Sequence, residues 1–425
     1  MEKSKELYIL IEGVFDTMDL YSEEIRDELS AAGKRVQVLT VDSMDADLPE
    51  MMRLMQEEGY EPKAVITFNN LGYNLGEKQG ANLWDAMGVV YINILMDHPF
   101  HYDVPLRNAP ACSRVLCIDK NHVQYIKAHY PNIRETGFLA HGGCAHAILG
   151  DGGKATGDEG FASAKSPENV RDIDVLYAGS LSRVFIEQLI PDFSQFPEVD
   201  GGTFSKRCLE SLIKDPSQLT EEVIERELAA ELMANGNPPE EMDPQVWEDL
   251  KMDYLNGFRF LDGFAVSYYR ELAVRILVEN GIRVHTLGVG WDTCDWSDNE
   301  NLIHLGKVSA TEVFDYMKRS KVVLNTLTWF KDGAHDRIFN GLLCGAAVVS
   351  DESVYLKGLG EVPGIHLFEL KHLNCLPDLV RSILSDETER RTEAAAGRAY
   401  VLHHHTWKQR LEEILRQDPV EEGTA

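Results

Sequence analysis

A single arginine at the expected start of a helix is the clearest candidate for chemistry in the second half of this chain. Residues 324–337, with the sequence LNTLTWFKDGAHDR, leave an apolar strand and lead into a helix expected over 338–344. The free N–H groups and positive dipole end of a helix N-terminus favour anions. The guanidinium of Arg337 adds two parallel N–H donors that match a phosphate. The sequence therefore predicts a diphosphate site inside an otherwise acidic protein.

A second group of polar residues follows a buried strand of the first half, in the run NILMDHPFH over 93–101. Asp97 and His98 stand at the carboxyl end of that strand, where a carboxylate or an imidazole suits a general base for a substrate hydroxyl. With Arg337 they are our catalytic candidates, and His101 and His141 are acceptor-side candidates. The alternatives are a polar loop tip, a structural Asp97, or a metal site, although the spacing matches no standard metal site.

The first 145 residues alternate short β-branched runs with amphipathic helical patterns, which predicts a parallel sheet covered by helices. Glycines follow several of the helical segments, as they commonly do where helices end. The expected strands are 7–11, 36–41, 64–68, 89–96, 115–118 and 136–140, and the expected helices are 21–32, 48–58, 77–87 and 121–129.

A second series of the same kind follows a small, polar, aperiodic stretch, so we predict an α/β protein of two Rossmann-like domains facing a central cleft. We place the first domain at 1–150, a linker at 151–171, the second domain at 172–405 and a terminal segment at 406–425. The second domain carries an acidic helical insertion at about 205–260. Its expected strands are 174–178, 284–287, 302–305, 322–327, 346–350 and 365–370, and its expected helices are 269–279, 311–319, 338–344, 376–384 and 388–403, with a last helix at 406–416.

Composition and missing motifs exclude several classes of protein. The chain has 70 acidic and 41 basic residues, a net charge of −29, which disfavours general binding to nucleic acid or anionic lipid. It has no P-loop, no G-x-G-x-x-G after the first strand, no G-x-S-x-G elbow and no H-E-x-x-H. The seven cysteines form no C-x-x-C pair, so we expect reduced, structural thiols. No apolar run is long enough for a membrane span and no signal peptide is visible, so we expect a cytoplasmic protein.

Several short motifs follow one another along the second half of the chain. They are DVLYAGS at 174–180, GVGW at 288–291, LGKV at 305–308, VVLN at 322–325, H-x-RIF at 335–339, LCGAAVVSD at 343–351 and HTWKQR at 405–410. Together, in this order, they resemble the C-terminal domain of a GT-B glycosyltransferase. Within that class they are similar to the bacterial CgeB-like family, whose second domain is of the glycosyltransferase family 1 type. The resemblance covers about 172–416, and the first half matches only as a generic acceptor domain.

This resemblance implies that a nucleotide-diphosphate sugar, most simply a UDP-sugar, binds the second domain. It implies that the base lies near 305–308 and the diphosphate near Arg337, with no metal and no cofactor, and that the last helix crosses back to the first domain. Trp291 would stack on the ligand or belong to the core. The implied donor-binding residues are Gly179, Ser180, Arg183, Gly290, Trp291, Gly306, Lys307, Val308, Asn325, His335, Arg337 and Asn340.

The activity implied is transfer of a hexosyl group to a hydroxyl of a protein or glycan (EC 2.4). One departure matters, because relatives carry a pair of glutamates where this chain has Asp332 and Asn340. Asn340 can hydrogen-bond a ribose hydroxyl but carries no charge. A degenerate GT-B protein that binds a sugar nucleotide or glycan without turnover is therefore the alternative, and a sugar-nucleotide epimerase is the third reading.

Overall fold

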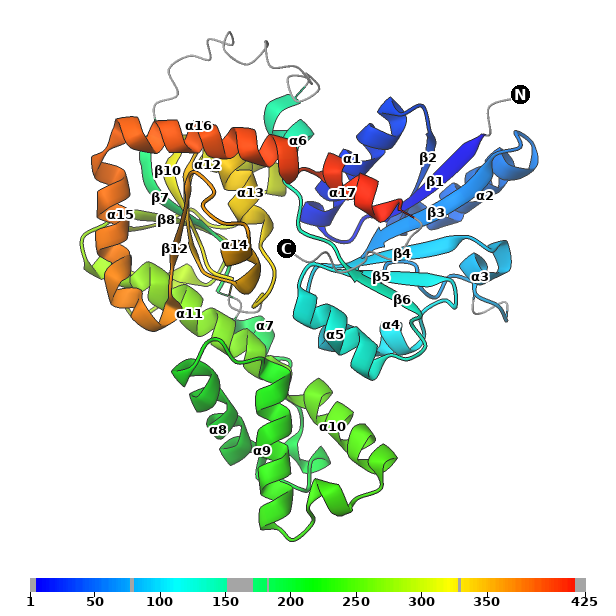
Figure 1. Cartoon of the computed structure of the whole chain (residues 1–425), viewed down its shortest axis with the longest axis horizontal. Coiled ribbons are helices and arrows are strands. Elements are labelled where there is room, and N and C mark those ends of the chain that lie inside the picture. The colour runs from blue at the N-terminus through cyan, green and yellow to red at the C-terminus, as the bar shows by residue number, and fades with distance from the viewer. Residues whose placement is uncertain (1–4, 77–79, 151–170, 182, 328–329, 417–425) are drawn as a thin grey trace.

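The chain forms two α/β lobes with a helical arm below them (Figure 1). The computed structural model describes residues 5–76, 80–150, 171–181, 183–327 and 330–416. The linker expected at 151–171 lies, except for residue 171, outside the described residues. Of the helices that are described, none combines the length and apolar character needed to cross a bilayer.

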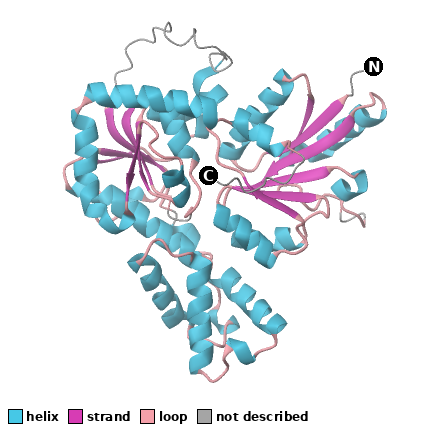
Figure 2. Cartoon of the chain, viewed as in Figure 1, coloured by secondary structure: helices cyan, strands magenta, loops and turns pink. Residues whose placement is uncertain are grey.

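The first lobe is built on a six-stranded parallel sheet in the order β2-β1-β3-β4-β5-β6. Its four central strands are rich in buried apolar residues because helices cover both faces (Figure 2), whereas the two edge strands are more polar and more exposed. The strands are β1 (Glu6–Glu12), β2 (Arg35–Thr40), β3 (Glu61–Phe68), β4 (Val90–Leu95), β5 (Ser113–Cys117) and β6 (Glu135–Phe138). The helices are α1 (Asp16–Ala31), α2 (Met44–Gln56), α3 (Leu83–Met87), α4 (Asp103–Arg107), α5 (Lys120–His129) and α6 (Ala145–Leu149).

The second lobe repeats this plan with a six-stranded parallel sheet in the order β12-β11-β10-β7-β8-β9. Its strands are β7 (Ile173–Ala178), β8 (Val284–Leu287), β9 (Leu302–His304), β10 (Ser320–Asn325), β11 (Ala347–Asp351) and β12 (Ile365–Phe368). Its helices are α7 (Arg183–Glu187), α11 (Phe260–Glu279), α12 (Ala310–Arg319), α13 (Asp336–Leu343), α14 (Val354–Gly358), α15 (Leu376–Ser385) and α16 (Glu387–His404).

Two parallel sheets were expected, and every expected strand is present. The helix predicted over 77–87 is shorter in the structure, where α3 begins only at Leu83. Residues 71–76, before the predicted helix, form turns. The cause is local, because the side chain of Asn82 caps this helix by accepting a hydrogen bond from Trp84 N.

Three helices between α7 and α11 form the arm: α8 (Gly201–Lys214), α9 (Thr220–Ala234) and α10 (Pro244–Phe258). The arm does not hang free, because it also contacts the first lobe. His129 Nδ1 lies 2.8 Å from Glu248 Oε1 of α10, and His98 Nε2 lies 3.3 Å from Glu221 Oε1 of α9. The arm therefore bridges the two lobes.

The last helix, α17 (Trp407–Ile414), leaves the second lobe and lies against α1 of the first (Figure 1). Trp407 is fully buried and stacks on Tyr21 of α1, with 4.9 Å between the ring centroids. Just before it, His405 O accepts a hydrogen bond of 2.7 Å from Gly143 N of the first lobe. The chain thus connects the lobes a second time.

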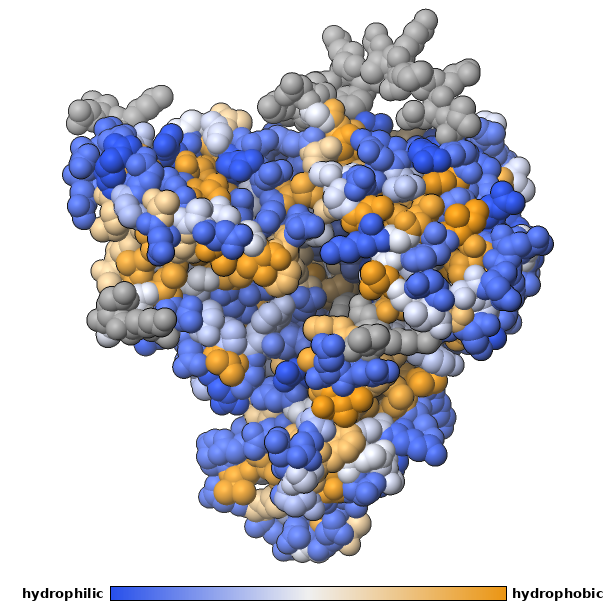
Figure 3. Space-filling view, turned by 180° about the vertical axis from the view of Figure 1, so that it is seen from behind, coloured by the Kyte–Doolittle hydropathy of each residue, from blue (hydrophilic) through white to orange (hydrophobic). Residues whose placement is uncertain are grey.

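Strand order fixes where a ligand can bind. In the first sheet, successive strands are added on one side of β1 and then, from β3 on, on its other side. In the second sheet the same change occurs between β7 and β10. Each sheet therefore has its crevice at the carboxyl ends of those two neighbouring strands. These carboxyl ends meet across the lobes, since Asp119 after β5 forms an antiparallel bridge with Gly333 after β10. Seen from behind, the surface is hollowed between the lobes, above the arm (Figure 3).

Candidate active site

Three glycine turns form one side of the crevice in the second lobe. They follow β7, β8 and β9, and backbone hydrogen bonds join them: Gly288 N donates to Gly306 O (2.9 Å), and Leu181 N donates to Val289 O (2.8 Å). Gly290 has a φ of +91°, and a Cβ there would lie 2.3 Å from Leu181 O. The glycines are thus required for close backbone packing, and they bring together motifs that are far apart in the sequence.

Two arginines lie beside these turns, on the ring of Tyr177 at the end of β7. The guanidinium carbons of Arg337 and Arg270 are 5.6 and 6.0 Å from the centroid of that ring. Arg270 Nη1 donates to Ser180 O, and Tyr177 shares a hydrogen bond of 2.8 Å with Thr326. Gly179 is essential to this arrangement, because a Cβ there would lie 3.3 Å from Arg337 Nη1.

Neither positive charge pairs directly with a described carboxylate, although Arg337, after His335, helps to hold the pKa of the buried Asp336 below its ordinary value. Within the parts of the chain that the structure describes, neither Arg270 nor Arg337 forms a salt bridge with a carboxylate, and Arg270 Nε is buried without a hydrogen-bond partner. Burial, with the nearby Arg337, lowers the pKa of Arg270 from its ordinary value. A pair of desolvated cations at the crevice of an α/β sheet is a site for an anion with two charges.

His335 links Arg337 to the next carboxylate. Its Nε2 accepts a 2.7 Å hydrogen bond from Arg337 Nη2, and its Nδ1 faces Asp336 Oδ1. Burial, together with the charge of Arg337, lowers the pKa of His335 to about 4, so the ring is neutral at pH 7. A neutral ring accepts from one neighbour and donates to the other, which fixes the direction of the Arg337 side chain.

The structure places the other predicted donor residues in different settings. Lys307 is exposed beside Gly306 and Val308, at the end of the turn layer. Trp291 is fully buried under the turns, where its Nε1 donates to Gly179 O (2.8 Å), so it belongs to the core rather than to a ligand-stacking face. Asn325 is also fully buried, with Nδ2 donating to Ser350 Oγ (2.9 Å) inside the sheet. Arg183 begins α7, and its side chain is not among those described.

Asn340 was expected to contact a ribose, but the structure uses it to join the lobes. Its Oδ1 accepts from Cys144 N of the first lobe (2.9 Å), its Nδ2 donates to Asp336 Oδ2 (3.2 Å), and it is 1% exposed. An asparagine suits this position because a glutamate would place a second carboxylate beside Asp336. The other departure, Asp332, donates its backbone N–H to Asp119 Oδ2 (2.8 Å) in the same junction.

On the acceptor side, the three predicted histidines are packed rather than presented to a cleft. His98 is 4% exposed, with Nδ1 accepting from Phe100 N and Nε2 facing Glu221 of the arm. Burial lowers the pKa of both His98 and His101 to about 3. His141 lies edge-on to Tyr21, with 5.1 Å between the ring centroids, in the contact between α1 and α17.

Asp97 and His101 are partly exposed, whereas His98 and His141 are buried. Two residues before Asp97, Leu95 pairs with Cys117, so Asp97 stands at the same height as Asp119 on the neighbouring strand. Asp119 contacts the second lobe, so Asp97 also stands at the level where the lobes meet. Burial raises its pKa above the ordinary value for a carboxyl group, and hydrogen bonds from Tyr102 and Asn69 oppose that rise.

Arg270 and Tyr177 were missed by the sequence reasoning. A signal did exist for Arg270, because it occupies a position of α11 that its spacing places on the buried stripe with Val266, Ala273, Val274 and Leu277. A charged residue on an apolar stripe needs a partner or a ligand. Tyr177 gave no such signal, since an aromatic residue at the end of a buried strand is ordinary.

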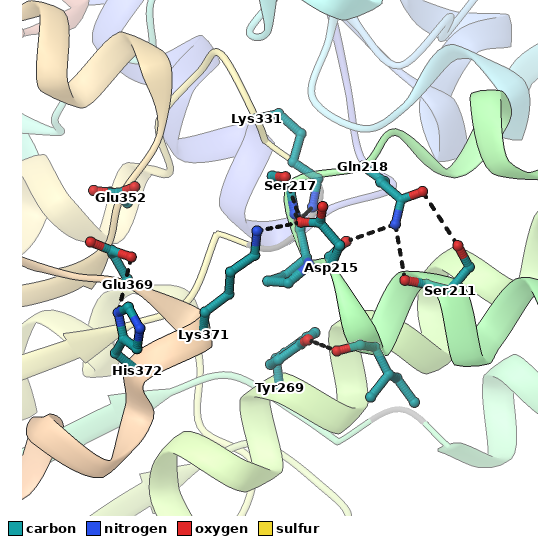
Figure 4. Close-up of polar contacts among 12 residues, drawn as sticks. Ser211, Asp215, Ser217, Gln218, Tyr269, Lys331, Glu352, Glu369, Lys371 and His372 are labelled. Atoms are coloured by element: carbon teal, nitrogen blue, oxygen red, sulfur yellow. Dashed lines mark hydrogen bonds and ion pairs between the residues drawn. The ribbon is translucent and has the colours of Figure 1, made fainter.

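A separate cavity of about 200 Å³ lies beside this site, at the carboxyl ends of β11 and β12. The loop between α8 and α9 closes it, and Lys331 and Lys371 project from its walls (Figure 4). Lys331 Nζ donates to Pro216 O, and Lys371 Nζ lies 2.8 Å from Asp215 Oδ1. Each of these two lysines therefore already has a hydrogen-bond or ion-pair partner at the cavity.

Comparison with known proteins places this geometry in context. Residues 270–416 match a protein family described as glycosyl transferase-like. No curated protein matches the chain at a significant level. Among solved structures, sucrose-phosphate synthase from Thermosynechococcus elongatus aligns with a TM-score of 0.50 and 11% identity, over 96% of this chain and 97% of that one.

Two further structures align at slightly lower scores. HepE from Anabaena in complex with UDP-glucose gives a TM-score of 0.49 and 13% identity over 96% of this chain and 98% of that one. An alpha-glucosyltransferase in complex with UDP and a DNA containing an HMU base aligns with a TM-score of 0.49 and 11% identity, over 97% of this chain and 100% of that one. The fold shared with the sucrose-phosphate synthase, two facing lobes built on parallel sheets, is GT-B, and residues 270–416 are similar to the glycosyl transferase-like family.

Proposed function

We propose that this protein is a glycosyltransferase that moves a hexosyl group from a nucleotide-diphosphate sugar, UDP-sugars being the first candidates, to a hydroxyl of a protein or glycan. The observation that carries the proposal is the pair of arginines, Arg270 and Arg337, beside the glycine turns at the crevice of the second lobe. Two adjacent guanidiniums that form no salt bridge among the described residues, Arg337 buried and Arg270 partly exposed, are a site for the diphosphate of such a donor.

Each part of the site then has a role. Arg270 and Arg337 neutralise the charge that develops on the leaving diphosphate, which is the largest electrostatic task in the reaction. Because two guanidiniums supply this charge, the reaction is metal-independent. The backbone of the turn at Gly306–Val308 borders the nucleoside, and Asp97 on the facing lobe takes the proton of the acceptor hydroxyl.

The test is incubation of the full chain with a panel of nucleotide sugars, with and without hydroxyl-bearing acceptors, followed by measurement of released nucleoside diphosphate. Release coupled to sugar transfer is expected, and EDTA should leave the rate unchanged. Activity that EDTA abolishes and a divalent ion restores would contradict the metal-independent reaction.

A second candidate is a GT-B protein that binds a sugar nucleotide without turnover. The position of Asn340 favours it, because the side chain expected to hold the ribose is occupied by Cys144 and Asp336 at the lobe junction. Saturable binding of UDP-sugars with no release of UDP under any condition tested would support this candidate over the first.

A further inference from the structure

Two successive residues after β3 have an unusual backbone conformation. Asn69 and Asn70 have φ values of +48° and +66°, and they are the only non-glycine residues with positive φ in the described part of the chain. This left-handed region costs side-chain-bearing residues energy, and it persists only where the surroundings enforce it. Such residues gather at functional sites more often than elsewhere.

The neighbouring strand holds this turn in place. Asn70 N donates to Asn93 Oδ1 (2.8 Å), and Asn93 Nδ2 donates to Asn70 Oδ1 (2.7 Å), so the two carboxamides pair within the core. Asn69 N donates to Ile94 O (3.0 Å), and Asn69 Oδ1 accepts from Met96 N (2.8 Å). The turn is therefore locked at the crevice between β1 and β3.

The consequence of this conformation is the direction of the Asn69 amide. Its Nδ2 donates to Asp97 Oδ2 (2.9 Å), and the hydroxyl of Tyr102 donates to the same oxygen (2.7 Å). Both donors act on Oδ2, and neither uses Oδ1. No described cation pairs with Asp97, so these two neutral donors alone orient the carboxylate.

We propose that Asn69 and Tyr102 are positioning residues that hold Asp97 as the general base for the acceptor hydroxyl, an assignment that rests on the proposed transferase function. The acceptor O–H proton passes to Asp97 Oδ1 as the oxygen forms its bond to the anomeric carbon. The bond from that carbon to the diphosphate breaks, and its electron pair leaves with the nucleoside diphosphate held by Arg270 and Arg337.

Two variants each remove one of the donors to Asp97. Tyr102→Phe removes the hydroxyl and keeps the ring, and Asn69→Gly removes the amide, together with the acceptor of Met96 N, in a residue that adopts positive φ without strain. Tyr91→Phe is the matched control, because the Tyr91 hydroxyl donates to Leu71 O of the same turn (2.7 Å) and leaves Asp97 untouched. Leu71 O still accepts from Thr67 Oγ1 in that control.

The first measurement needs no substrate. In protein labelled with ¹³C at aspartate carboxyls, the resonance missing from Asp97→Asn identifies Asp97, and its titration is followed in each variant. Both donors favour the charged carboxylate, so the pKa of Asp97 should rise in Tyr102→Phe and in Asn69→Gly and stay constant in Tyr91→Phe. An unchanged titration in both variants would overturn the positioning role.

The second measurement is the pH profile of kcat/KM with the nucleotide sugar that the wild type turns over. The acidic limb should move to higher pH in the two variants, with a loss at pH 6 that recovers by pH 9, and Asp97→Asn should lose at least about a hundredfold. If the pKa of Asp97 changes in the variants but the pH profile of kcat/KM does not, Asp97 is not the base, and the transferase function is unaffected by that result. If the wild type releases no nucleoside diphosphate from any donor, the transferase function fails and the base role fails with it.

Discussion

Replacing Arg270 by methionine should separate ligand binding from folding. The guanidinium donates to Ser180 O and lies against Tyr177 beside a second guanidinium, with no described carboxylate to balance it. A hydrogen bond between a charged donor and a phosphate contributes about 1.5–3 kcal/mol. Arg270→Met should therefore weaken the binding of UDP by about 10- to 150-fold.

The same substitution should change the stability of the protein very little. It removes one hydrogen bond, which costs about 1 kcal/mol, but it also removes a buried charge beside the like charge of Arg337. These effects oppose each other, so the free energy of unfolding should change by less than about 1 kcal/mol. Methionine keeps the apolar stem that packs on α11.

Isothermal titration with UDP measures the first effect, and urea denaturation measures the second. Arg275→Met is the matched control, because Arg275 lies on the same helix and pairs with Glu279 at 2.7 Å on the exposed face. Equal dissociation constants for wild type, Arg270→Met and Arg275→Met would refute a diphosphate site at the arginine pair. A loss of several kcal/mol of stability in Arg270→Met would show instead that the residue is structural.

Three further substitutions test the junction and the buried carboxyl groups. Asn340→Glu should not restore a donor contact but should lower stability by about 1–3 kcal/mol in urea denaturation, because it puts a second buried carboxylate beside Asp336. Gly333→Ala should separate the lobes, since its Cβ would lie 2.3 Å from Ile118 O, and solution scattering should show a larger radius of gyration than for wild type. Burial raises the pKa of Asp262 to about 6 from 3.8, so the native state holds the proton more tightly and loses stability as pH rises between these values. Asp262→Asn lacks this dependence, so its stability relative to wild type should rise by up to about 3 kcal/mol from pH 4 to pH 7.5. A difference in the free energy of unfolding between Asp262→Asn and wild type that stays constant from pH 4 to pH 7.5 would contradict the raised pKa of Asp262.

The sequence determined the fold because the signals for it are local. Apolar runs of strand length, helical periodicity and the glycines after helices all act within about 15 residues, and together they located every strand of both sheets. The same reasoning placed Asp97 directly after a buried strand and Arg337 at the start of a helix, and the structure has them after β4 and in the first turn of α13. Connectivity alone requires that placement.

Only the tertiary structure decided which polar residues are free to act. His98 follows the same strand as Asp97, His141 follows β6, and Asn340 lies in the same helix as Arg337. Each nevertheless has a partner more than 100 residues away: Glu221, Trp407 and Cys144. Arg270 joins Arg337 across 67 positions of sequence for the same reason. Long-range partners depend on how the lobes and the arm pack, and a strand or helix pattern carries no information about that packing. The local sequence therefore determined where the candidate groups lie in the fold. Desolvation and pairing between distant elements determined which of these groups carry a charge without a salt-bridge partner.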